Sequence, residues 1–208
     1  SNIEANLDKR FTRSPLEQTQ KIKEPSSTLN PLQITSQQFD LEPGRVVFSG
    51  MVSVSNNDEK LSSDSITVGM RGNEWEMQNI RAIGSVVLQA DRIKTTSEQA
   101  NYDLVAGLIV LKGNPSWTMG ERSGRANLLM IHRESQSVNA EGEVAMKLPA
   151  DSAGEGELLD FIASGDGTTD GLPLEIRSNV FLFQAATPDQ TGFARYIGSV
   201  RLARGEGR

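Results

Sequence analysis

The chain has 208 residues, of which 37% are hydrophobic and 19 are glycine, so it is long enough to bury one substantial core. Its formal net charge of −6 argues against a broad surface for nucleic acid, which needs clustered Lys and Arg, and we expect no nucleic-acid partner. No apolar run reaches the ~18 residues that a membrane-spanning helix needs. The absence of cysteine excludes disulfides and thiolate chemistry, and the single histidine leaves little scope for a metal centre or a catalytic triad.

Residues 1–31 contain scattered apolar side chains, three prolines and no sustained period. This composition predicts a flexible N-terminal arm, because such a segment cannot bury enough apolar surface to fold. Folding proper is predicted to begin near Leu32, and we assign residues 32–208 to one β-domain.

Apolar residues alternate with polar ones in short runs after residue 32, which is typical of half-buried β-strands. The segment Asp91–Tyr102 could be argued as a helix, but its adjacent threonines and missing apolar stripe weaken that interpretation. Turn-rich clusters separate the runs, and many short strands at even spacing predict an all-β protein. The runs are Phe48–Val54, Ile66–Val68, Ile80–Leu88, Leu104–Val110, Val138–Met146, Leu172–Ile176 and Tyr196–Leu202.

A weak internal repeat relates residues 82–115 to residues 140–173, with Ala, Gly and Val recurring at the same places. The frame Gly-x-Val occurs at Gly50, Gly84, Gly142 and Gly198. Because glycine weakens a strand interior, its recurrence predicts a bulge, a sharp bend or a close approach of neighbouring backbones. This pattern fits either a repeating β-layer or a β-sandwich with glycines at ordinary bends.

Several short motifs occur in a fixed order and spacing: Phe48-Ser-Gly50-Met-Val52, Leu61-Ser-Ser-Asp64, Ala82-Ile-Gly84-Ser-Val86, Ala100-Asn-Tyr102 and Leu111-Lys-Gly113-Asn-Pro115, with a restart at Tyr196-Ile-Gly198-Ser-Val200. Together they resemble the OstA-like family. The family contains the periplasmic lipopolysaccharide-export proteins LptA and LptC and the N-terminal domain of LptD. Two departures are Ser63, where the family commonly has Ala, and residues 151–171, which are either an insertion or a degenerate repeat.

The resemblance implies a twisted β-jellyroll of antiparallel strands, open at both ends, with an apolar interior for the acyl chains of lipopolysaccharide or a related amphiphile. It implies a periplasmic protein whose leader or membrane anchor is not present in this chain. It also implies association with other OstA-like export proteins through edge strands, including a head-to-tail homo-oligomer, because unpaired edges template a further strand. The motif that restarts near the end leaves two alternatives open, namely a chain that continues past Arg208 and a last strand that is a free edge.

The candidate lipid-binding residues are apolar and lie in the alternating runs. Two interpretations stay open for each, since a residue that contacts an acyl chain and a residue of a plain core have the same chemistry. They are Phe48, Val52, Val54, Ile66, Val68, Val86, Leu88, Leu111, Val144 and Met146.

No catalytic residue, metal ligand or cofactor is predicted. His132 has neither a second histidine nor a cysteine to share a metal, and the carboxylates are dispersed along the chain. Trp75 and Trp117 both follow turns, which suits either a groove mouth or ordinary packing at a sheet rim. The predicted function is therefore binding and relay of lipopolysaccharide without chemistry, and the alternative is a structural envelope protein that assembles through edge strands and carries no lipid.

Overall fold

The computed structural model describes residues 3–6, 33–56, 59–72, 76–90, 93–149, 173–187 and 191–204. Within these ranges all regular elements are strands, and they form one 15-stranded sheet in which every paired strand is antiparallel. The same ranges contain no helix whose length and apolar character would let it cross a membrane. The predicted all-β fold class is confirmed.

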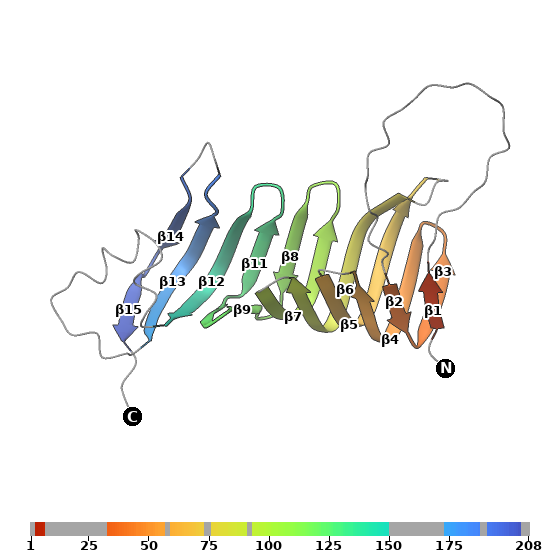
Figure 1. Cartoon of the computed structure of the whole chain (residues 1–208), viewed down its shortest axis with the longest axis horizontal. Coiled ribbons are helices and arrows are strands. Elements are labelled where there is room, and N and C mark those ends of the chain that lie inside the picture. The colour runs from red at the N-terminus through yellow and green to blue at the C-terminus, as the bar shows by residue number, and fades with distance from the viewer. Residues whose placement is uncertain are drawn as a thin grey trace, which may run out of the picture.

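Six long strands carry most of the sheet, and shorter strands complete it (Figure 1). The pairs β2/β3, β8/β9, β10/β11 and β14/β15 each follow one another through a short bend and together take the place of one long strand. The long strands are β4 (Arg45–Ser55), β5 (Glu59–Arg71), β6 (Glu76–Ala90), β7 (Ile93–Asp103), β12 (Ser137–Leu148) and β13 (Leu174–Gln184). The short ones are β1 (Ile3–Asn6), β2 (Gln33–Ser36), β3 (Gln38–Glu42), β8 (Leu108–Lys112), β9 (Ser116–Met119), β10 (Arg122–Arg125), β11 (Leu128–His132), β14 (Phe193–Ile197) and β15 (Arg201–Arg204).

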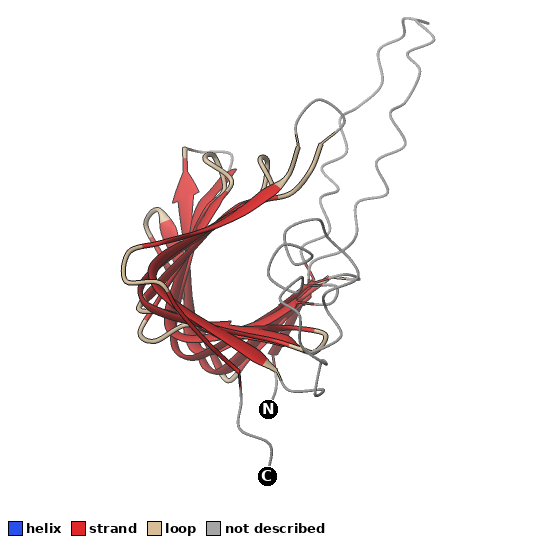
Figure 2. Ribbon diagram, turned by 90° about the vertical axis from the view of Figure 1, so that its left-hand side faces the viewer, coloured by secondary structure: helices blue, strands red, loops and turns tan. Residues whose placement is uncertain are grey.

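Every long strand bends near its middle, so the sheet has two halves. The upper half contains β3, β8, β11 and β14 and the parts of the long strands that pair with them. The lower half contains β1, β2, β9, β10 and β15 with the remaining parts. Figure 2 views the sheet from one end, along the direction in which the strands follow one another, which we call the stack. In this view the sheet curls into an open C.

In every second strand of the sheet the bend is made by a glycine. We call each of these glycine bends a corner. At each corner a glycine with φ between +74° and +79° precedes a residue with φ between +47° and +52°. Glycine takes this left-handed conformation without the steric cost that other residues meet, and the extra residue shifts the ladder register as in a β-bulge. The corners are Gly50–Met51, Gly84–Ser85, Gly113–Asn114, Gly142–Glu143 and Gly198–Ser199.

A polar side chain from the preceding strand lies over each corner glycine. At Gly84 this is Asp64, whose carboxyl group would overlap a Cβ added to the glycine. The equivalent residues over the other corners are Gln37, Glu98, Asn127 and Asn179, and the backbone N–H of each donates to the corner glycine's carbonyl at 2.9 to 3.3 Å. The predicted close approach and bulge at the Gly-x-Val frame are confirmed.

Ser63 sits beside this contact and is itself 5% exposed. Its hydroxyl donates to the carbonyl of Ser65 at 2.9 Å, and Ser36, Ser97 and Ser178 make the same contact two residues ahead at three of the other four corners. The serine that departs from the family pattern therefore stabilises the bent strand.

The structure decides two local predictions of secondary structure. Ile93–Asp103 is strand β7, which excludes the weak helix interpretation. The run Leu104–Val110 is not one strand, because residues 104–107 form a turn and the buried face of β8 carries Ile109 and Leu111. The predicted arm lies outside the described residues apart from β1, which pairs with β2, and residues 151–171 lie outside them entirely.

Candidate functional site

Two apolar rows run across the sheet on its concave side, one in each half. In each row, every residue is the direct cross-strand partner of the next, so the rows pass from one end of the stack to the other. The upper row is Leu41, Val46, Val68, Ile80, Tyr102, Ile109, Ile131, Val138, Phe183 and Ala194. The lower row is Ile34, Val54, Leu61, Leu88, Thr95, Trp117, Gly124, Met146, Ile176 and Leu202.

The two halves pack against each other close to the corners, where residues of both belong to one hydrophobic cluster. Tyr196 of the upper half donates its hydroxyl hydrogen to Met146 Sδ of the lower half at 3.5 Å. Burial raises the pKa of Tyr196 to about 12, so the phenol is neutral at physiological pH. Apolar packing and this neutral contact thus join the two halves.

Burial falls with distance from the corners. Val52, Val86, Leu111 and Val144, each two residues from a corner glycine, are at most 1% exposed, and so is Ile66, two residues from the Asp64 that lies over Gly84. Most apolar residues four positions from a corner are either 5% to 9% exposed or half-buried, and Leu202 is 51% exposed. We call five half-buried residues of the two rows the rim residues, namely Ile80, Leu88, Ile109, Ile131 and Val138.

The sequence-predicted residues lie mainly in the packed interior. Nine of them, all except Leu88, belong to the buried cluster, while Leu88 is a half-buried rim residue of the lower row. Leu129 and Ile176 were missed although they are among the most deeply buried side chains. Ile176 stands in the alternating run Leu172–Ile176, and Leu129 stands in the continuous apolar run Leu128–Ile131, which were the available signals.

The two tryptophans have different outcomes. Trp117 lies in the lower row and is half-buried, with its indole packed on Gly124 of β10, where a Cβ would overlap the ring. Trp75 is outside the described residues. His132 is exposed at the end of β11.

An ion pair joins the outer ends of the two halves of the sheet, and we call the space between these ends the mouth. Arg133 follows β11 at the outer end of the upper half, and Glu59 begins β5 at the outer end of the lower half. Their Nη2 and Oε1 atoms are 2.7 Å apart, although the residues are 74 positions apart in the chain. Tyr102 of the upper row supports the guanidinium with a hydroxyl 3.3 Å from Nη1 and a ring centroid 5.7 Å from Cζ. We call these three residues the clasp.

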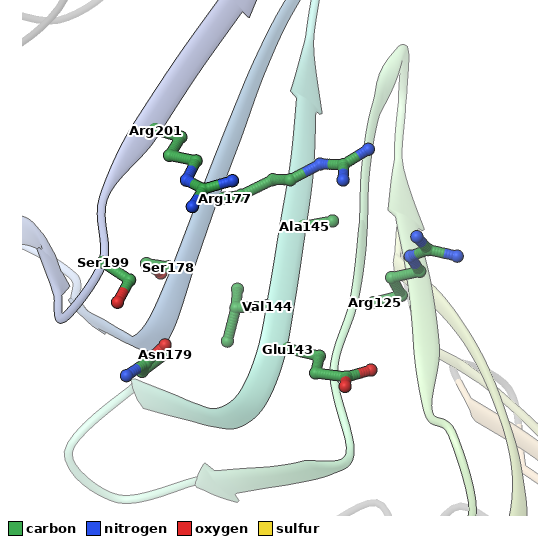
Figure 3. Close-up of a pocket in the computed structure, with 9 residues that line it drawn as sticks. All are labelled: Arg125, Glu143, Val144, Ala145, Arg177, Ser178, Asn179, Ser199 and Arg201. Atoms are coloured by element: carbon green, nitrogen blue, oxygen red, sulfur yellow. The ribbon is translucent and has the colours of Figure 1, made fainter.

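A polar pocket of about 260 Å³ lies on the other side of the sheet (Figure 3). Cross-strand pairing places Arg125, Ala145, Arg177 and Arg201 in one row there, with the small alanine between arginines. Arg177 pairs with Glu175 at 2.7 Å. This lining is charged, so the pocket is not a continuation of the apolar rows.

These features define a curled antiparallel β-sheet protein with two continuous rows of mainly apolar residues on its concave side. Comparison with known proteins points to the same class. The family model described as "LptA/(LptD N-terminal domain) LPS transport protein" matches residues 33–137. The crystal structure of LptH from Pseudomonas aeruginosa, titled as the LptA homologous periplasmic component of the lipopolysaccharide transport device, aligns with a TM-score of 0.50. That alignment has 17% identity and covers 57% of this chain and 87% of LptH. No curated protein sequence matches the chain.

The chain belongs to the family of LptA and LptD N-terminal domain lipopolysaccharide transport proteins, whose model matches just over half of it. The predicted family is therefore confirmed, and so is the assignment to a transport protein that is not an enzyme. The likeness to LptH confirms the jellyroll fold.

Proposed function

We propose that this protein binds lipopolysaccharide or a related amphiphile in the periplasm and passes it along the groove between its two apolar rows. The observation that carries the proposal is the continuity of both rows from one end of the sheet to the other. Apolar side chains remain exposed where the rows end, at Leu41 (58%) and Leu202 (51%). An apolar path with exposed ends gives acyl chains a place to enter and to leave without any chemical step.

The acyl chains are proposed to contact the rim residues rather than most of the residues singled out from the sequence. Side chains that are at most 1% exposed leave no space for a ligand beside them, because they are already in contact on all sides. Rim residues such as Ile109 and Ile131 combine an apolar surface with partial exposure. They are also direct cross-strand partners, so they form one continuous patch.

Contact between acyl chains and the rim residues can be tested by placing a polar or charged side chain at the rim. Ile131→Asp should lower the affinity for the fluorescent apolar probe N-phenyl-1-naphthylamine at least about tenfold, because bound chains would have to desolvate a carboxylate. His132→Asp is the matched control, since it adds the same charge to the next residue, whose side chain is exposed. Fluorescence titration measures binding and circular dichroism verifies folding, with Leu88→Asn repeating the test in the lower half.

Equal probe binding by folded wild-type protein, Ile131→Asp and Leu88→Asn would contradict the groove assignment. The interior would then be a core alone, and the protein would be a structural element of the envelope that assembles through its edges.

Assembly is proposed to occur head to tail, and toward other family members, through the edge strands. In the described part of the chain, β3 pairs only with β4, and β14 pairs only with β13. The register in which β4 and β5 pair at their corner can be applied to the edge strands of two copies of the chain. It places β14 of one copy beside β3 of the next, with Arg195 opposite Asp40 and Tyr196 opposite Phe39. The contact would thus join opposite charges on one face and apolar rings on the other, a favourable cross-strand arrangement.

In the lower half, β1 already covers the edge of β2 over four residues. Addition at that half therefore requires β1 to leave, whereas the upper half is open for pairing. This makes the contact between β3 and β14 the expected first step of assembly.

Charge exchange tests this contact. Arg195→Asp should raise the dissociation constant of self-association several-fold, and adding Asp40→Arg to the same chain should restore it, because the pair is rebuilt with reversed charges. Sedimentation velocity measures both. Failure of the double variant to recover association, when the single variant has lost it, would contradict the proposed register.

A further inference from the structure

The clasp of Glu59, Tyr102 and Arg133 indicates which kind of headgroup the ligand has. This inference rests on the proposed function. Arg133 and Glu59 belong to opposite halves of the sheet, and their ion pair spans the opening through which a ligand would enter the groove from the side. The side chains of the pair are 45% and 35% exposed. A half-exposed pair of this kind contributes little stability, so it is easily exchanged for another anion.

The surroundings of Arg133 keep it ready for such an exchange. Tyr102 holds the guanidinium from the same half of the sheet, through its hydroxyl at 3.3 Å and its ring at 5.7 Å. These contacts do not depend on Glu59, so they remain if the carboxylate moves away. A guanidinium that is already oriented loses less conformational freedom when it binds a ligand.

Apolar surface begins directly behind the cation. Tyr102 is the cross-strand partner of Ile109, and Ile109 is the partner of Ile131, two residues before Arg133. On the opposite side, Leu61 of the lower row is two residues from Glu59 and faces the same way along β5. A ligand seated here would meet a fixed cation and an adjoining apolar row, which is the pattern that an anionic amphiphile fits.

We propose that Arg133 is the anchor for a phosphate-bearing headgroup, which replaces the Glu59 carboxylate on the guanidinium when acyl chains enter the groove. A phosphate group offers more oxygens than a carboxylate and matches the planar donor fork of arginine. Binding would release the link between the two halves and so open the mouth as the chains enter. Loss of the ligand would let Glu59 return and close it.

The experiment uses two detergents with the same chain, dodecyl phosphate and dodecyl maltoside, titrated calorimetrically below their critical micelle concentrations. Wild-type protein should bind dodecyl phosphate at least about tenfold more tightly than dodecyl maltoside. Arg133→Gln should abolish this preference. Glu59→Gln should strengthen dodecyl phosphate binding, because the competing carboxylate is gone.

Arg45→Gln is the matched control. Arg45 also pairs with a glutamate, Glu42, but both lie beside one turn of a single half and do not span the mouth. This variant removes one positive charge and should keep the wild-type preference.

The outcomes separate this inference from the function on which it rests. Binding of neither detergent by folded wild-type protein would contradict the proposed function itself. Equal binding of both detergents by wild-type protein, or an undiminished preference for dodecyl phosphate in Arg133→Gln, would overturn the headgroup assignment and leave the apolar groove standing. Loss of the preference in Arg45→Gln would show a general charge effect and would also overturn it.

Discussion

Val144→Asp is expected to destabilise the protein by about 4 kcal/mol, which is enough to unfold a domain of ordinary stability. The side chain of Val144 is 1% exposed and lies in the cluster that joins the two halves of the sheet. A carboxylate there would lose its hydration and find no cation within the buried cluster. The loss should appear as a lower midpoint of urea unfolding, with loss of probe binding as its consequence.

Ala145→Asp is the control for this prediction, because Ala145 is the next residue and faces the other side of the sheet. Its cross-strand partners are Arg125 and Arg177, so the new carboxylate would lie between two guanidinium groups. The free energy of unfolding should change by less than about 1 kcal/mol. A wild-type midpoint for Val144→Asp would mean that its side chain faces water, which would contradict the packed interior.

Gly84→Ala is expected to destabilise the protein by about 3 kcal/mol, the second large effect. One part of the loss comes from placing a side chain at φ +78°, which L-residues rarely adopt. The other part comes from overlap between the new Cβ and the carboxyl group of Asp64. Chemical denaturation measures the sum.

Gly72→Ala separates the two contributions, since Gly72 also has a positive φ, +66°, but a Cβ there would meet nothing within 4 Å. It should cost about 1 kcal/mol. Asp64→Ala combined with Gly84→Ala should recover most of the difference between the two glycine variants. Equal losses at Gly72 and Gly84 would mean that the contact at the corner does not contribute.

The strand content was predictable because alternation is local. The side chains of Phe48 and Val52, or of Ile80 and Val86, face one side of a strand whatever lies across from them. The same rule was wrong for Leu104–Val110, where alternation continued by chance through a turn that the Asp103 carboxylate stabilises by accepting from the N–H groups of Val105 and Ala106.

The glycine frame was predictable as a bulge, a sharp bend or a close approach, and not as a set of aligned corners. Glycine inside a strand indicates a bulge or a close approach, and Gly84 and Gly142 show both. What the pattern could not supply is the partner, since Asp64 and Asn127 come from the preceding strand and look like ordinary polar residues. The alignment of all the corners, which folds the sheet into two halves, follows from the pairing register.

The amino-acid sequence alone was sufficient for the fold class, the family resemblance and the apolar character of the interior, because these depend on residue type and short-range period. Tertiary structure decided which apolar residues are fully packed and which stay partly exposed. Val86 and Leu88 are equally hydrophobic and two residues apart, yet only the first lies close enough to a corner to be enclosed by both halves. The clasp is also a product of the tertiary structure, because curling of the sheet is what brings Glu59 to Arg133 across 74 residues of chain.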